Sequence, residues 1–536
     1  MHSNATRTRD VKRACSAVLG ALVFGAVSSC ATQGPRDPRD WFSPRVDVVK
    51  ETMILDGDFT DWHGTPTALT VAAPSPLQSV RFRDTPKYLH INLTFRDSVN
   101  LQAMPGTLHL LFSGVGAKDT NTVYGVRHVD FSLDLSRLDK LQAGGRGAGF
   151  ALRPVHESGL GEFRSPYDLE VAALPTWASN EFELRLKRMP RDQFGELHPM
   201  FLNFTAVYVG TDSVVHKSAT VAHRWNTAPD YTPLARIDTI FAPFPGSFRV
   251  AQWNVSEGSF SRPAMHARLL AAVTPDVVML DEVYEQVTAD SLRRFFDLPE
   301  LKALGPWQFV IAGSGGRQRT VVAARQRNVR PVESMARMQY EPGALDSLKR
   351  VFPTAAHRLI EIEEQAQISS VGAWVDINGT DVMFVPLDLQ SGGYAGSVHD
   401  ALRILQARAI RGYIRAEVQA RTSFPIVVAG DFNPVGSFQS ITILGRDLLN
   451  DISRQLRPAH NLRLADYSAV TWESKDAAQF APGRLDLTYY TGLQHTNGFV
   501  FTTQDLSDRL LNKLGMTQDT FEKVADHFIV VSDFKR

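Results

Sequence analysis

Acidic and amide side chains recur in this sequence where apolar, strand-like segments end. In the stretch VAGDFNPVGS (428–437), three apolar or small residues run directly into Asp431, Phe432 and Asn433. Similar positions are occupied by Asn254, Glu282, Asp388, Asp486, and Asp526 with His527. Loops at the ends of packed strands can bring catalytic groups together on a rigid support. The recurrence therefore indicates a shared site, although an Asx turn that merely ends a strand is the simpler interpretation of GDFNP alone.

These residue types suit the cleavage of a phosphate ester. That reaction needs an activated water, an electrophilic phosphorus and a stabilised leaving oxygen. Glu282 is a hard oxygen ligand of the kind that Mg²⁺ prefers, and Asn254 could reach the same metal or the phosphate. In an extended chain Asp431 and Asn433 lie on one side, where the acid could orient or deprotonate water and the amide could donate to a phosphate oxygen. Gly430 is expected to remove a side chain beside the substrate.

Five short motifs follow one another along residues 248–536. They are WNV with Asn254, PDVVMLDEV with Glu282, VVAGDFNPVGS with Asp431 and Asn433, RLDLTYY with Asp486, and VADHFIVVSDF with Asp526 and His527. Together they resemble the endonuclease/exonuclease/phosphatase superfamily. The resemblance implies a deoxyribonuclease-like α+β fold, a four-layer sandwich of two packed β-sheets flanked by helices. It also implies a phosphoesterase that uses Mg²⁺, or Mn²⁺ or Ca²⁺ in its place.

The resemblance assigns roles to these residues. Asp431, Asn433, Asp486 and His527 would be catalytic, with the carboxylate of Asp486 orienting the imidazole of His527. The metal would be bound by Glu282 and Asn254, with Asp526 nearby.

Two features depart from this pattern or lie outside it. Many family members have a histidine where this chain has Asp388, and an anionic carboxylate there would repel a phosphate. Asp388 could bind a second metal, another group could protonate the leaving oxygen, or activity could be reduced. Arg317 and Arg319, in a Gly-rich basic stretch, could bind phosphate together with position 388, or could belong to a solvated hairpin.

The chain has 536 residues, which is enough for two or three domains. Residues 50–226 contain short alternating segments, such as YLHINLTF (88–95), with Gly, Pro and Asp turns between them, and this pattern predicts an all-β sandwich. Its opening, ILDGDFTDW (54–62), resembles family-nine-like carbohydrate-binding modules, so a glycan is one conceivable partner. The position of Trp62 favours a core residue that closes one end of the sandwich over a platform for sugar. Residues 227–247 are Pro-rich and predict a linker, and SVHDALRILQARAIRGYIRAEVQAR (397–421) predicts a long helix capped by Ser397.

The N-terminus has the pattern of an export signal. A basic start is followed by an apolar stretch that ends in VSSC, with Cys30 last, which resembles the lipobox of bacterial lipoproteins. This predicts a signal peptide over 1–29, lipidation of Cys30, a tether over 30–49, and location in the bacterial cell envelope on the outer membrane. An ordinary signal peptide with an incidental Cys30 is the alternative.

The balance of charged residues gives only a weak indication of the binding partner. Lys plus Arg and Asp plus Glu both number 57, so net charge does not favour a general nucleic-acid binder, although a local phosphate site is compatible with it. The main hypothesis is a lipid-anchored, metal-dependent phosphoesterase whose phosphate-ester substrate is of unknown class. The alternative is a glycan-binding surface lipoprotein with a catalytically degenerate phosphoesterase domain.

Overall fold

The computed structural model describes residues 53–114, 120–136, 149–188, 201–256, 260–421, 423–445, 455–474 and 479–536. The predicted signal peptide, the tether and Cys30 lie outside the described residues. In the described part of the chain, no helix combines the length and apolar character needed to cross a membrane.

Strands form most of the regular structure. In the N-terminal half they are β1 (Leu69–Thr70), β2 (Leu77–Asp84), β3 (Tyr88–Val99), β4 (Gly106–Gly114), β5 (Thr122–Val123), β6 (Val126–Arg127), β7 (Phe131–Leu135), β8 (Phe150–His156), β9 (Gly159–Leu160), β10 (Ala172–Leu174), β11 (Ser179–Lys187), β12 (Phe201–Gly210), β13 (Val215–Lys217) and β14 (Val221–Ala222). In the C-terminal half they are β15 (Phe248–Asn254), β16 (Val277–Tyr284), β17 (Trp307–Ile311), β18 (Gln318–Arg325), β19 (Val329–Pro331), β20 (Ala373–Ile377), β21 (Thr380–Asp388), β22 (Ile426–Asp431), β23 (Arg457–Pro458), β24 (Leu462–Arg463), β25 (Asp486–Thr491), β26 (Gln494–Phe501) and β27 (Ile529–Lys535).

The described α-helices all follow β15. They are α1 (Pro263–Val273), α2 (Ala289–Phe296), α3 (Pro299–Lys302), α4 (Asp346–Val351), α5 (Ala356–Glu361), α6 (Val398–Ala420), α7 (Gln439–Gly445) and α8 (Asp508–Leu514). The long helix expected over 397–421 is α6, and Ser397 caps it by accepting a hydrogen bond from the Asp400 backbone. A serine at this position satisfies a backbone N–H that has no partner within the helix.

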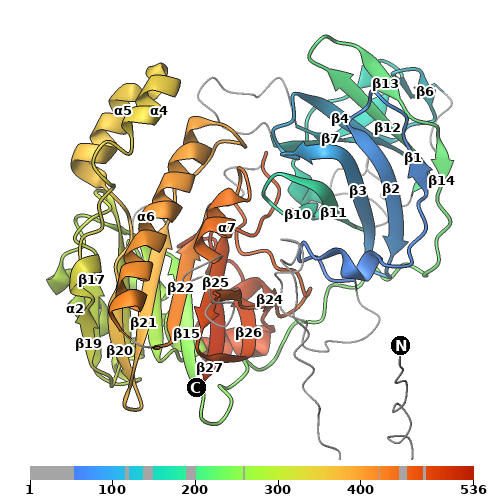
Figure 1. Ribbon diagram of the computed structural model, residues 1–536. Coiled ribbons are helices and arrows are strands. Elements are labelled where there is room, and N and C mark those ends of the chain that lie inside the picture. Colours follow the sequence, from blue (N-terminus) through green and yellow to red (C-terminus); the bar gives the residue numbers. More distant parts are fainter. Residues whose placement is uncertain are drawn as a thin grey trace, which may run out of the picture. The chain divides into compact units, whose positions relative to one another are not determined.

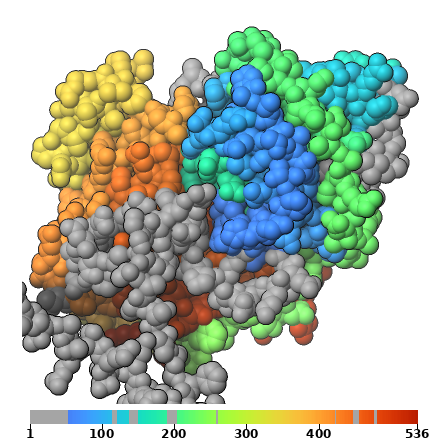
Figure 2. All heavy atoms as spheres, turned by 45° about the vertical axis from the view of Figure 1, so that its right-hand side comes forward, coloured from blue at the N-terminus to red at the C-terminus, as the bar shows by residue number. Residues whose placement is uncertain are grey.

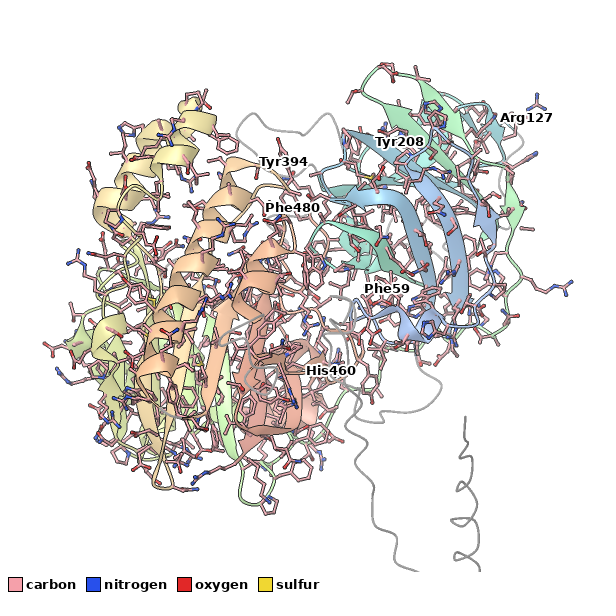
Figure 3. All side chains as sticks on the ribbon, in the orientation of Figure 1. Phe59, Arg127, Tyr208, Tyr394, His460 and Phe480 are labelled. Carbon is pink, nitrogen blue, oxygen red and sulfur yellow. The ribbon has the colours of Figure 1, made fainter. Side chains whose placement is uncertain are left out.

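Two large antiparallel sheets and a two-stranded antiparallel sheet, β5-β6, make up the described N-terminal half. One large sheet has the strand order β1-β2-β3-β11-β10 and the other β13-β12-β4-β7-β8-β9, with β14 paired to β12. Apolar side chains from both large sheets form one buried cluster, to which β3 contributes Leu89, Ile91, Leu93 and Phe95, the residues expected on one face. In Figure 2 the blue residues, which include β2 and β3, form a continuous surface. Figure 3 shows Arg127, at the end of β6, pointing away from its strand.

Trp62 belongs to the interior. Its side chain is 1% exposed, and its indole N–H donates to a carboxylate oxygen of Glu183 at 3.3 Å. This position supports the interpretation of Trp62 as a core residue and leaves it unable to act as a sugar platform.

Two further sheets make up the C-terminal half. Their strand orders are β17-β18-β16-β15-β27-β26-β24 and β19-β20-β21-β22-β25-β23. One buried cluster joins Val250 and Val277 of the first sheet to Val375, Phe384 and Val427 of the second. Helices α6 and α7 lie over the second sheet (Figure 1). Helices α1, α2 and α8 bury their apolar residues in a separate cluster with the first sheet.

The segment between β24 and β25 contacts the N-terminal sheets. Arg185 of β11 donates to Asp466 at 2.8 Å, and both side chains are buried. The backbone N–H of Ala469 donates to the carbonyl of Leu55 at 2.8 Å, and Leu55 lies in the cluster formed with the first C-terminal sheet. The N-terminal half therefore supports the chain just before Asp486.

The predicted linker, 227–247, contains almost no regular secondary structure. It contacts the C-terminal half at Ile237, whose backbone N–H donates to the carbonyl of Asp505 and whose carbonyl accepts from the N–H of Ser507, both at 2.9 Å. The domain boundaries themselves stay a prediction.

Candidate active site

The residues at the strand ends meet because their strands are neighbours. Strand β21 runs parallel to β22, and β22 runs antiparallel to β25, so the end of β22 lies beside the start of β25. As a result Asp388, Asp431 and Asp486 are register partners across three adjacent strands. We call these three residues the aspartate row. Residues in register on neighbouring strands project to the same face of a sheet, so the row concentrates three carboxyl groups.

Polar side chains from the other sheet bind this row. Gln252 donates from its amide to Asp281 at 3.2 Å and to Asp486 at 3.0 Å. The backbone N–H of Asp431 donates to Asp281 at 3.2 Å, and Asn254 donates to the Asp431 carboxylate at 3.3 Å. The two sheets thus meet at the site through hydrogen bonds as well as apolar packing. Gln252 and Asp281 were not predicted as site residues, although an acid within the buried strand PDVVMLDEV is a signal that could have found Asp281.

His527 lies between two carboxylates. Its Nδ1 is 2.9 Å from Asp486, and its Nε2 is 3.7 Å from Asp431. Because a carboxylate only accepts, Nδ1 carries a proton and donates it to Asp486. Burial lowers the pKa of His527, but Asp486 and Asp431 outweigh this effect and raise the pKa well above its usual value. The two carboxylates therefore favour the protonated imidazole, which can donate from Nε2 as well as from Nδ1.

Asp431 and Asn433 do not face outward side by side. Asn433 has a φ of 43°, its backbone N–H donates to Asp431 at 2.8 Å, and its side-chain amide donates to Asp431 at 2.8 Å and to the carbonyl of Leu389 at 2.9 Å. The expectation of an extended chain here is wrong, and the GDFN motif does form an Asx turn. Asn433 therefore orients Asp431. Burial raises the pKa of Asp431 to about 7, although His527 opposes this shift.

Gly430 is required by the sheet. Its φ is 149°, and a Cβ at this position would lie 1.9 Å from the carbonyl oxygen of Leu387 in β21. The glycine thus permits close approach of two strands, whereas the sequence suggested that it makes room for substrate.

Glu282 is redirected by an irregularity in its strand. It has a φ of 55°, and the pairing of β16 with β18 shifts register between Leu280 and Val283. Such bulges re-aim a side chain at the end of a strand. Its carboxylate accepts hydrogen bonds from Asn254 and Gln318, and burial raises its pKa against the influence of His527.

Asp526 is held by two donors. Ser256 donates to one carboxylate oxygen at 2.6 Å, and the indole of Trp472 donates to the other at 3.0 Å. Burial raises the pKa of Asp526, but His527 and these two donors lower it below its usual value overall. Ser256 and Trp472 have no motif that would have identified them from the sequence.

Arg319 stabilises the turn that follows Glu282. One of its guanidinium nitrogens donates to the carbonyls of Tyr284 at 3.0 Å, Glu285 at 3.2 Å and Val287 at 2.7 Å. The guanidinium of Arg317 lies 5.5 Å from the centre of the Tyr284 ring. These contacts differ from the phosphate binding suggested for both arginines, and they give Arg319 a structural role.

The donor set suits a hard cation. Over the described ranges, no group of three or more His, Cys, Asp or Glu side chains is arranged to hold a metal ion. Mg²⁺ is often bound by only one or two carboxylates, with water and substrate oxygens completing its shell. Glu282, with the amide of Asn254 beside it, fits that requirement.

No family model and no curated protein sequence matches the chain. Solved structures that resemble it include the 3′ phosphatase NExo from Neisseria bound to a product DNA hairpin, with 15% identity over 54% of this chain and 100% of that chain, and a TM-score of 0.35. TDP2 from C. elegans has 15% identity over 54% of this chain and 75% of that one, with a TM-score of 0.35. The human Nocturnin catalytic domain has 16% identity over 55% and 96%, with a TM-score of 0.32. These likenesses are too distant to transfer an activity to this chain.

Proposed function

We propose that this protein hydrolyses phosphate esters with the help of a divalent cation. The observation that carries the proposal is the position of His527, whose buried ring nitrogens lie 2.9 Å from Asp486 and 3.7 Å from Asp431, close to the Glu282 carboxylate. A buried histidine paired with carboxylates contributes little net stability, because the cost of desolvating the charges offsets their attraction. The arrangement is useful where a phosphate must be bound and a water activated.

The residues have separate tasks in this proposal. Nε2 of His527 donates a hydrogen bond to a phosphoryl oxygen and stabilises its growing negative charge. Asp431, whose pKa lies at about 7, accepts the proton of the attacking water. A bond forms between the water oxygen and phosphorus, the bond to the leaving oxygen breaks, and that oxygen takes up a proton from solvent. Asp486 fixes the imidazole, and Asn433 fixes Asp431.

Glu282 and Asn254 would hold the cation, with Asp526 close to them. When bound, Mg²⁺ would supply a positive charge that polarises the phosphoryl group.

The proposal also covers the folds of the two halves and the attachment of the protein to a membrane. We propose that residues 248–536 form four layers, with two packed sheets between outer helices, and that residues 50–226 form a β-sandwich. The shared apolar clusters support both arrangements. The lipobox-like VSSC supports a lipid anchor at Cys30 in the cell envelope.

Hydrolysis of bis-p-nitrophenyl phosphate and p-nitrophenyl phosphate tests the activity. We expect turnover with Mg²⁺ or Mn²⁺, loss with a chelator, and loss in His527→Ala. His357→Ala is a matched control because His357 is exposed on α5, and it should retain full turnover. The ratio of diester to monoester rates would indicate the class of ester. Turnover that survives both the chelator and His527→Ala would contradict the proposal, and no turnover with any metal would favour the glycan-binding alternative.

A further inference from the structure

Asp388 occupies one end of the aspartate row. It is the last residue of β21 and the register partner of Asp431. Asp431 and Asp486 are both bound by protein donors: Asn254 and Asn433 donate to Asp431, and Gln252 and His527 donate to Asp486.

The Asp388 carboxyl lacks such support. Its side chain is 9% exposed, and among the described residues no donor forms a hydrogen bond with it. A buried charged group without a hydrogen bond is costly, so a carboxyl in this position calls for a partner that the protein itself does not supply.

The surroundings of Asp388 are negative. Burial raises its pKa well above the usual value, and the carboxylates of Glu282, Asp431 and Asp281 raise it further, in that order of effect. Among the described groups whose charges act most on Asp388, only His527 opposes them. Asn254 links the two carboxyl groups, because it donates to Glu282 and, at 3.3 Å, to Asp431, the register partner of Asp388. Asp388 and Glu282 therefore reach the same part of the site from different sheets.

We infer that Asp388 is a second carboxylate ligand of the divalent cation, which binds between Asp388 and Glu282. The inference rests on the proposed function and extends it. A cation in this space gives Asp388 its missing partner and neutralises its repulsion with Glu282. Two carboxylates from two sheets, with water and phosphate oxygens completing the shell, form a site typical of Mg²⁺.

This assignment explains the chemistry of a position where a histidine would be expected. A neutral imidazole donates to a phosphate, whereas a carboxylate bound to a cation contributes charge to the metal and no longer repels the substrate. Asp388 then acts on the substrate through the metal.

Binding of Mn²⁺ tests the inference without relying on activity. Free Mn²⁺ is measured by electron paramagnetic resonance, and affinity by calorimetry, for the wild type, Asp388→Asn, Glu282→Gln and Asp376→Asn. Asp376 is an exposed strand residue that serves as the matched control. We expect Asp388→Asn to weaken Mn²⁺ binding by about tenfold or more, because a ligand should matter at least as much as the groups that orient ligands. Asp376→Asn should bind as the wild type does.

Thermal unfolding provides a second readout. Without metal, Asp388→Asn should melt at a higher temperature than the wild type, because a repelled carboxyl is replaced by a neutral amide. With Mn²⁺ present, its gain in melting temperature should be smaller than that of the wild type.

If Glu282→Gln loses Mn²⁺ affinity while Asp388→Asn keeps it, the inference is wrong and the proposed cation site stands. In that case a protonated Asp388 that donates directly to phosphate becomes the better explanation. If the wild type binds no divalent cation, both the inference and the proposed function are overturned.

Discussion

The ion pair between Arg185 and Asp466 should couple the N-terminal sheets to the active site. The two side chains are 6% and 4% exposed, and their charged atoms are 2.8 Å apart. Replacing Arg185 with Met leaves Asp466 buried without its nearest cation. Breaking a buried pair by removing one partner costs about 3–5 kcal/mol. Arg463 lies 3.9 Å from the other oxygen of Asp466, so we expect the lower half of that range.

The pKa of Asp466 decides the pH at which unfolding should be measured. Although burial raises the pKa of Asp466, Arg185 and Arg463 lower it far below the usual carboxyl value. A carboxyl whose pKa is lowered on folding stabilises the protein above its unfolded pKa near 4, and this stabilisation is lost as the pH falls towards the folded pKa. Unfolding should therefore be measured near pH 7.

A double-mutant cycle in urea isolates the interaction. We expect Arg185→Met and Asp466→Asn each to destabilise the protein, and the double variant to lose clearly less than the sum of the two. Phosphoesterase activity should fall in Arg185→Met, since the same segment carries Trp472, which donates to Asp526. Additive losses, or a loss below about 1 kcal/mol in Arg185→Met, would refute the argument that this pair couples the sheets to the site.

Three further results are expected. Asp486→Asn should lower the pKa of His527, because Asp486 is the strongest group that raises it. NMR titration of the imidazole should show this shift, and the high-pH limb of the rate profile should move to lower pH. An unchanged pKa of His527 would contradict its pairing with Asp486. In the presence of chelator, the raised pKa of Asp431 means that the folded state keeps a proton that the unfolded chain releases. The contribution of protonated Asp431 to stability should therefore decline as the pH rises from about 4 to about 7. Melting curves of Asp431→Asn should lack that decline. Gly430→Ala should cost about 3 kcal/mol or more, because its Cβ would meet the Leu387 carbonyl; a wild-type melting temperature would show that β21 and β22 can separate locally.

Much of the candidate site was accessible from the sequence. Polar residues directly after apolar strands were expected to share one place, and Asn254, Glu282, Asp431, Asp486 and His527 do converge. The prediction works because strand ends are local features, marked by a change from apolar to polar residues that any correct pairing of the strands must respect. The capped helix after Ser397 was predictable for the same local reason.

Contacts across the fold were not accessible in this way. The bridge from Gln252 to Asp281 and Asp486 joins two sheets through residues that are 29 and 234 positions apart. The use of Arg319 to hold the turn after Glu282 depends on the pairing of β16 with β18. No pattern within a short stretch of sequence indicates contacts between residues that lie so far apart along the chain.

Local sequence is enough to identify the residues at strand ends, the starts of helices and the side chains that can carry a charge, because these features depend on neighbours along the chain. Tertiary structure alone decided which of those charges are paired. It places His527 between two carboxylates and leaves Asp388 buried without a donor from the described part of the chain. The physical reason is that burial and the nearest opposite charge set the state of an ionisable group, and both arise only when distant strands pack together.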